Sequence, residues 1–140
     1  DVVNLIPLAD QPRVKVAVEG DPERMIAMGD PAELDILVSN LVSNAMKYSE
    51  NDSSVTVTLA REAEWVVLSC EDQGIGIAPA DRTQLFREFF RSESPEVKAQ
   101  PGTGLGLTIV DRIVTRHLGR IEVDSELGEG STFRVFLPGD

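Results

Sequence analysis

PGTGLGL, at residues 101–107, is the most informative segment of the chain, and it runs directly into TIVDRIV, which has a helical pattern. It is not a Walker loop, because no Gly-Lys-Ser/Thr follows it. Its G-x-G-x-G spacing after a loop also differs from the dinucleotide fingerprint, which follows a strand. Alternating glycines before a helix allow close backbone approach and present free N–H groups at the positive end of the helix dipole. We interpret the segment as an anion site, with a hinge that binds no ligand as the alternative.

The acidic composition of the chain limits how it can bind an anion. Its 140 residues, 41% of them hydrophobic, suit one domain with a proper core. A net charge of −11 argues against nucleic acid as a partner. An anionic ligand would therefore need helix N-termini and backbone N–H groups instead of overall positive charge. The apolar runs are too short to span a bilayer, and the N-terminus lacks the basic start of a secretory signal. We expect the single cysteine, Cys70, to be a small core residue.

Hydrophobic periodicity and turn signals predict a mixture of strands and helices, several strands being joined by hairpins. We therefore expect an α+β two-layer sandwich, with a mixed, largely antiparallel sheet of about five strands and helices packed on one face. Asp30, Pro31 and Glu33 have the pattern of an N-cap, a first-turn proline and a capping box. The expected elements are strands at 13–18 and 24–28 around the turn EGDPE, a helix from Pro31 to about Tyr48, strands at 54–60 and 65–70, a short helix at 82–91, a helix from about Thr103 to Leu118 with Gly119 as its C-cap, and a hairpin of 120–126 and 131–137.

The helix expected at 31–48 carries a polar stripe along the border of its apolar face. Asn40, Asn44 and Lys47 recur at i, i+4 and i+7, and Tyr48 lies between the two stripes. Asparagine is a poor residue in a helix interior, so two of them a turn apart need a reason. A carboxamide oxygen suits Mg²⁺, and a lysine suits phosphate. The alternative is a solvated shoulder of an amphipathic helix.

A second glycine cluster, DQGIGI at residues 72–77, follows an apolar strand pattern. Burying Asp72 at the strand end would be costly unless its carboxylate is hydrogen-bonded. The carboxylate could accept a hydrogen bond from the exocyclic amine of a purine, and Gly74 and Gly76 would leave room for a flat ring. An ordinary Asx-type turn is the alternative.

Taken together and in order, four segments resemble the N, G1, F and G2 boxes of two-component sensor histidine kinases. They are NLVSNAMKYS at 40–49, DQGIGI at 72–77, LFREFFR at 85–91 and GTGLGL at 102–107. The resemblance covers about residues 28–137 and is to the catalytic, ATP-binding domain, which has the Bergerat fold shared with DNA gyrase, Hsp90 and MutL. It implies a single domain over 1–140, with 1–12 as a linker or the end of a preceding segment and 91–103 as the ATP lid.

The resemblance also implies a role for each matching residue. Asn44 would bind Mg²⁺, Asn40 would lie near the phosphates, Lys47 would contact phosphate and Tyr48 would flank the nucleotide. The remaining implied site residues are Asp72 for the adenine amine; Gly74, Gly76 and Ile77 for the base pocket; Phe86 and Phe89 to anchor the lid; Arg91 for the γ-phosphate; and Gly102, Thr103, Gly104, Leu105, Gly106 and Leu107 for the triphosphate.

The implied activity is transfer of the γ-phosphoryl group of Mg-ATP to a histidine on a separate dimerisation domain, and from there to a response regulator. The full protein would be a homodimeric, membrane-anchored sensor kinase with this domain in the cytoplasm. In the gyrase and chaperone branch a glutamate activates water where this chain has Asn40, so we expect slow hydrolysis. We expect His117, the only histidine, to be structural or capping, and Leu118 replaces the first of two glycines usual in the family. The alternatives are an anti-sigma-type serine kinase, against which the F box and long lid argue, and a non-catalytic nucleotide-binding module.

Overall fold

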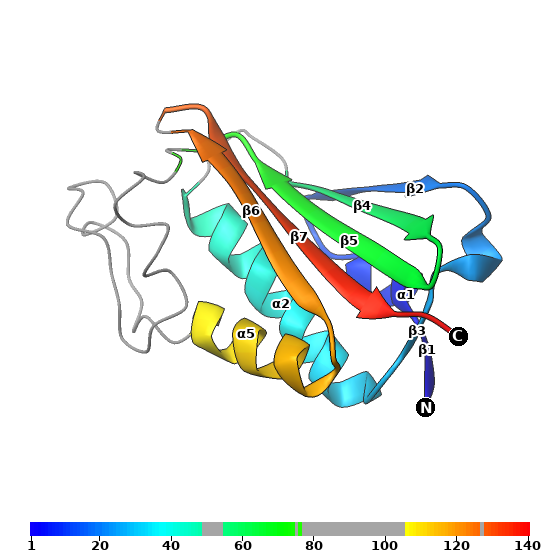
Figure 1. The fold of residues 1–140 in the computed structure, drawn as a ribbon. Coiled ribbons are helices and arrows are strands. Elements are labelled where there is room, and N and C mark those ends of the chain that lie inside the picture. Colours follow the sequence, from blue (N-terminus) through cyan, green and yellow to red (C-terminus); the bar gives the residue numbers. More distant parts are fainter. Residues whose placement is uncertain (49–54, 75, 77–105, 127) are drawn as a thin grey trace.

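The computed structural model describes residues 1–48, 55–74, 76, 106–126 and 128–140. Within these ranges, two long helices lie against one face of a five-stranded sheet (Figure 1). The elements are β1 (Val2–Asn4), α1 (Leu5–Ala9), β2 (Val14–Glu19), a 3-10 turn (Pro22–Arg24), β3 (Ile26–Met28), α2 (Pro31–Tyr48), β4 (Val55–Glu62), β5 (Trp65–Asp72), α5 (Gly106–Arg116), β6 (Arg120–Glu126) and β7 (Gly130–Pro138).

The main sheet has the order β2-β4-β5-β7-β6 and is antiparallel except where β2 pairs with β4. Side chains alternate between its two faces, as the twofold period of a strand requires. Leu59, Leu68 and Val135 lie side by side across three strands and are fully buried under α2 and α5. The expected α+β sandwich with a mixed, largely antiparallel sheet is therefore confirmed, and Cys70 is a buried core residue as predicted.

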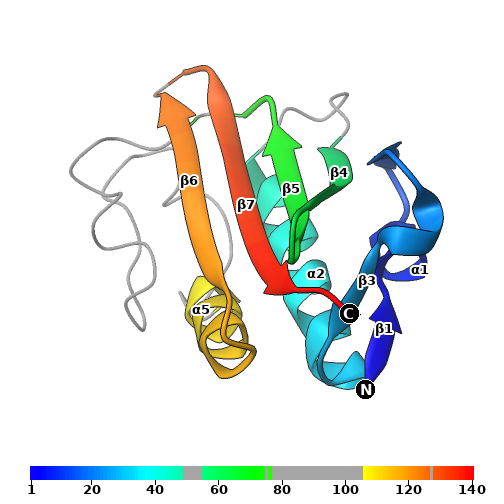
Figure 2. The ribbon, with the colours of Figure 1, turned by 45° about the vertical axis from the view of Figure 1, so that its right-hand side comes forward.

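The N-terminal strands pair differently from the expected hairpin around EGDPE. β2 runs parallel to β4, while β3 pairs antiparallel with β1 in a small separate sheet beside the main one (Figure 2). The expectation of a hairpin was wrong because the partner of each strand comes from elsewhere in the chain. The segment expected as a linker, residues 1–12, contains β1 and α1, and Leu5 and Ala9 of α1 are fully buried in the core.

Helix α2 begins and ends where the sequence predicts, but its N-terminus is capped in another way. The Asp30 carboxylate accepts hydrogen bonds from the backbone N–H groups of Ala32 at 2.9 Å and Glu33 at 3.2 Å, as an N-cap should. The reciprocal bond of a capping box is absent among the described residues: the Asp30 N–H donates to His117 instead, and the Glu33 carboxylate pairs with Arg116. Both partners lie at the end of α5, so the start of α2 is bonded to a distant part of the chain.

Helix α5 ends in a Schellman motif, with Leu118 and not Gly119 in the left-handed position. Leu118 has φ 60°, its N–H donates to Thr115, and the Gly119 N–H donates to the Val114 carbonyl. Gly119 is needed for a different reason, because a Cβ there would come within 2.1 Å of the Phe136 carbonyl oxygen. The prediction of Gly119 as the residue that turns the chain was therefore wrong. The expected start of this helix at Thr103, and the short helix at 82–91, lie outside the described residues.

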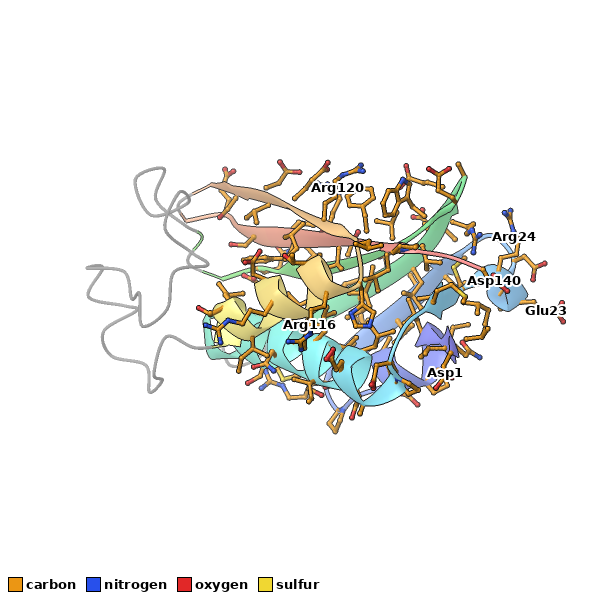
Figure 3. The ribbon with its side chains drawn as sticks, turned by 60° about the horizontal axis from the view of Figure 1, so that its bottom comes forward. Asp1, Glu23, Arg24, Arg116, Arg120 and Asp140 are labelled. Carbon is orange, nitrogen blue, oxygen red and sulfur yellow. The ribbon has the colours of Figure 1, made fainter. Side chains whose placement is uncertain are left out.

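The sheet face opposite the helices carries a small aromatic cluster. Trp65 and Phe136 meet edge to face, with ring centroids 6.4 Å apart. The Arg120 guanidinium lies 3.9 Å from the Phe136 centroid and 5.4 Å from that of Trp65, and Figure 3 shows Arg120 on this outer face. Val67, which pairs with Phe136 across β5 and β7, is buried beneath this cover. The sheet thus has a second, minor apolar layer separate from the main core.

Candidate nucleotide site

The asparagine stripe of α2 lies on the side of the helix that faces α5. Glu33, Asn40 and Asn44 are spaced by 7 and 4 residues, which places them on one side of a 3.6-residue helix. Glu33 bonds to Arg116 of α5, so this side of α2 is turned toward α5. Asn40 and Asn44 are both half-buried at the border of the apolar face.

The two asparagines differ in their hydrogen bonds. The Asn40 amide nitrogen donates to the Ile36 carbonyl at 2.8 Å, one helical turn back. Within the described ranges, no hydrogen bond joins the Asn44 carboxamide to another residue. Lys47 and Tyr48 belong to the last turn of α2, and their side chains lie outside the described part of the chain. Among the described residues, the Asn44 amide oxygen is therefore left without a partner, on the side of α2 that faces α5.

Asp72 is the last residue of β5 and is buried, with only 5% of its surface exposed. Its carboxylate accepts a hydrogen bond from the Gly74 N–H at 2.9 Å, and the backbone N–H of Ser131, the cross-strand partner of Asp72, also favours the charged carboxylate. Burial raises the pKa of Asp72, and these two donors oppose that rise only in part. The bond to Gly74 is the Asx-type turn that the sequence left open. A buried carboxylate with a raised pKa is a candidate ligand-binding group, because it can accept a further hydrogen bond from a ligand.

The turn between β6 and β7 packs against the backbone of Asp72. Gly130 has φ +95°, and a Cβ on it would lie 2.2 Å from the Asp72 carbonyl oxygen. Sequence reasoning treated this glycine only as part of a hairpin turn and missed both Gly130 and Ser131 as neighbours of Asp72. The register pairs Asp72 with Ser131. Gly130 in GEGS (residues 128–131), the first residue of β7, was the available signal.

Three features that the sequence predicted as ligand-binding lie at one end of the molecule. The C-terminal halves of α2 and β5 and the N-terminus of α5, which begins with Gly106 and Leu107, all lie at the left of Figure 1. A contact between the Cys70 thiol and the Leu41 carbonyl, 3.8 Å apart, joins β5 to α2 just before this end. Gly76, with φ +74°, adopts a conformation that favours glycine.

Other predicted site residues fall outside the described residues. They are Ile77, Phe86, Phe89, Arg91, Gly102, Thr103, Gly104 and Leu105, together with the rest of the expected lid at 91–103.

A metal ion at this end would depend on the amide of Asn44. Among the described residues, no group of three or more His, Cys, Asp and Glu side chains is arranged to hold a metal. A hard cation accepts an amide oxygen together with water and phosphate oxygens, so an asparagine amide such as that of Asn44 fits Mg²⁺ brought by a nucleotide. Asp72 also borders an open depression whose lining includes Glu71, Asp124 and Glu129, and the charges of these residues would repel phosphate there.

Comparison with known proteins identifies the family of the chain. Residues 29–140 match the family model described as histidine kinase-, DNA gyrase B- and HSP90-like ATPase. SenX3, a sensor-like histidine kinase of Mycobacterium tuberculosis (strain H37Rv), is 38% identical over 130 residues, which are 93% of this chain and 32% of that protein. Sensor histidine kinase RppB of Synechocystis sp. is 38% identical over 112 residues, 80% of this chain and 25% of RppB. The chain thus spans about a third or less of the length of these relatives.

Solved structures of similar proteins have the same fold. The mycobacterial sensor histidine kinase MprB is 30% identical with a TM-score of 0.83, over 99% of this chain and 97% of that one. Full-length ShkA, solved in complex with AMPPNP, is 29% identical with a TM-score of 0.72, over 96% of this chain and 27% of ShkA. None of the helices in the described ranges has both the length and the apolar character that crossing a membrane would take.

Proposed function

Because the chain belongs to the family of histidine kinase-, DNA gyrase B- and HSP90-like ATPases, we propose that it binds Mg-ATP and passes the γ-phosphoryl group to a histidine of a separate dimerisation domain. One observation supports this above the others. The Asn44 amide, which has no hydrogen-bond partner among the described residues, lies at the same end of the fold as the buried carboxylate of Asp72 and the N-terminus of α5. This end can receive a base and a metal-bound phosphate chain at once.

Asp72 would select the base. Its carboxylate would accept a hydrogen bond from the exocyclic amine of adenine while the Gly74 N–H, 2.9 Å away, holds it in place. Guanine presents a carbonyl oxygen where adenine has this amine, and two acceptors would then face each other. Asp72 therefore favours ATP over GTP. Gly74, Gly76 and Ile77 would border the ring, and Tyr48 would flank the nucleotide.

The phosphates would be held by donors and not by overall charge. Bound Mg²⁺ would neutralise phosphate charge, with Asn44 as its protein ligand. Lys47 and the free N–H groups at the start of α5 would contact phosphate oxygens. The other residues in this proposal are Phe86 and Arg91 of the lid region and Gly102, Thr103, Gly104, Leu105, Gly106 and Leu107 of the glycine-rich segment.

Asn40 would limit wasteful hydrolysis. A carboxamide cannot take a proton from water, and the Asn40 nitrogen is already bonded to the Ile36 carbonyl. The domain would thus keep the γ-phosphoryl group until a histidine of the dimerisation domain arrives, after which a response regulator would receive it. We place this domain in the cytoplasm, as one part of a homodimeric, membrane-anchored sensor kinase.

Calorimetry with a non-hydrolysable ATP analogue, with and without Mg²⁺, tests the proposal directly. We expect Mg²⁺ to strengthen binding to the parent chain but not to Asn44→Ala. Ser43→Ala, an exposed neighbour on the same helix, is the matched control and should behave like the parent. Nucleotide binding to the parent that Mg²⁺ does not strengthen would overturn the metal assignment.

Transfer is tested by adding a histidine-bearing dimerisation domain and labelled ATP. Acid-labile labelled phosphate on that domain is the expected product. Acid-stable label would indicate a serine kinase, and tight nucleotide binding without any transfer would indicate a binding module.

A further inference from the structure

His117 bonds the end of α5 to the start of α2. Its Nδ1 lies 2.7 Å from the Ile113 carbonyl oxygen, one turn back in α5. Its Nε2 lies 3.1 Å from the backbone nitrogen of Asp30, the N-cap of α2. The two bonded segments are 87 residues apart in the sequence.

The two contacts determine the state of the imidazole. A carbonyl oxygen can only accept, so Nδ1 must carry the proton. A backbone N–H can only donate, so Nε2 must be bare. Only the neutral ring protonated at Nδ1 makes both bonds. Neither a lysine nor an aliphatic side chain could replace it.

Two neighbours hold the ring and the helix ends in place. A Cβ on Gly29 would lie 2.3 Å from the imidazole, so the ring packs directly on this glycine. Arg116, labelled in Figure 3, donates two hydrogen bonds to Glu33 of α2, at 3.1 Å and 2.6 Å. The two helices are thus joined at this end by the hydrogen bond from the Asp30 N–H to His117 and by the two-bond ion pair between Arg116 and Glu33.

The helix ends opposite to this junction carry the candidate nucleotide site. From His117 to Gly106 is 11 residues, or about 16 Å of helix at 1.5 Å per residue. A 5° tilt of α5 about its pinned end would therefore move its N-terminus by roughly 1.4 Å. Displacements of about 1 Å are enough to spoil the alignment of a reacting group. The angle that α5 takes at this junction therefore determines the position of its N-terminus in the candidate nucleotide site.

We propose that His117 is a positioning residue for the nucleotide site, fixing the angle between α5 and α2. This role rests on the proposed function. By holding the angle, His117 keeps the N-terminus of α5 at the distance from the Asn44 amide that a metal-bound triphosphate needs.

Three variants separate positioning from general stability. His117→Leu removes both hydrogen bonds and keeps much of the volume. His117→Gln restores an acceptor for the Asp30 N–H. Val67→Ala removes buried methyl groups from the opposite sheet face and lowers stability without touching the helices. For each variant we would measure unfolding by denaturant, hydrogen exchange of the Asp30 N–H, and affinity for an ATP analogue under conditions where all are folded.

We expect His117→Leu to expose the Asp30 N–H to exchange and to weaken nucleotide binding roughly 10-fold. His117→Gln should regain part of both losses, and Val67→Ala should bind within about twofold of the parent at comparable loss of stability.

Four results would overturn the assignment. If the parent binds nucleotide and His117→Leu binds it equally well, the positioning role is wrong and the proposed function stands. If Val67→Ala loses as much affinity, the effect is one of stability. If His117→Gln is no better than His117→Leu, the acceptor at Nε2 is not what matters. If the parent binds no nucleotide, the proposed function fails and this role fails with it.

Discussion

Replacing Gly130 by alanine should lower both the stability of the fold and its affinity for nucleotide. Gly130 lies at the start of β7, against the backbone of Asp72, and has φ +95°. A side chain in this region of φ costs about 1–2 kcal/mol. The new Cβ would also lie 2.2 Å from the Asp72 carbonyl oxygen and 3.1 Å from the Gln73 Cα. Both of these are backbone atoms, so no side chain can rotate away to relieve the contact.

The expected magnitude follows from these two causes. Forcing atoms into a packed site costs about 1–3 kcal/mol beyond the φ penalty, so the total loss of stability should be about 2–5 kcal/mol. Gly128 provides a matched control in the same turn. It has φ +85°, but a Cβ on it would meet nothing within 4 Å. Gly128→Ala should therefore lose only the φ penalty, about 1–2 kcal/mol.

Affinity provides the second measurement. If the proposed hydrogen bond between Asp72 and adenine is lost through a shift of Asp72, binding should weaken roughly 10- to 150-fold, the range for a bond to a charged group. Gly128→Ala should bind like the parent. Denaturant midpoints and calorimetric titration of both variants supply the comparison. Equal midpoints and equal affinities for the two variants would show that the contact between Gly130 and Asp72 does not position the carboxylate.

Three further outcomes follow from single residues. Burial raises the pKa of Asp72, so the folded state favours its protonated form and the parent should lose stability as pH rises from the ordinary aspartate range through the raised value. Asp72→Asn should not show this loss; a difference in denaturation midpoint that is constant with pH would contradict the reasoning. Leu118 is 80% exposed with φ 60°. Leu118→Val should therefore cost about 1 kcal/mol in thermal unfolding while Leu118→Gly costs nothing measurable, because a β-branched side chain is the more strained there. Burial raises the pKa of the Cys70 thiol to about 12, so a thiol reagent at pH 8 should label it only as fast as the protein unfolds, and rapid labelling of folded protein would refute its burial.

Local patterns account for what the sequence predicted correctly. The bounds of α2 follow from an apolar period and an N-cap, both of which involve residues within a few positions of each other. The antiparallel strands follow in the same way from alternation and short turns. The pairing of distant segments is not determined by local patterns. β2 pairs with β4, about 40 residues later in the chain, and the Asp30 N–H donates to His117. Neither pairing leaves a mark in the sequence near either partner.

The residues of the candidate site also differ in whether local sequence could predict them. Asn44 and Asp72 could be singled out because an asparagine in mid-helix and an aspartate at the end of an apolar strand are each unfavourable without a purpose. Gly130 could not be singled out in this way. A glycine is required there because a Cβ added to it would lie 2.2 Å from the Asp72 carbonyl oxygen, and that contact depends on the fold. The same holds for Gly119 and the Phe136 carbonyl. Such close approaches become visible only when the strands are paired.

The placement of Trp65 determines what the chain's own fluorescence can report. Trp65 is the only tryptophan and begins β5, whereas Asp72 ends it. Seven residues of strand separate the two by about 23 Å. The indole also lies under Arg120 on the outer face of the sheet. Its emission should therefore follow loss of the sheet on denaturation and stay constant as nucleotide is added, so an optical titration of binding would need a dye or a second indole placed near the ends of α2 and α5.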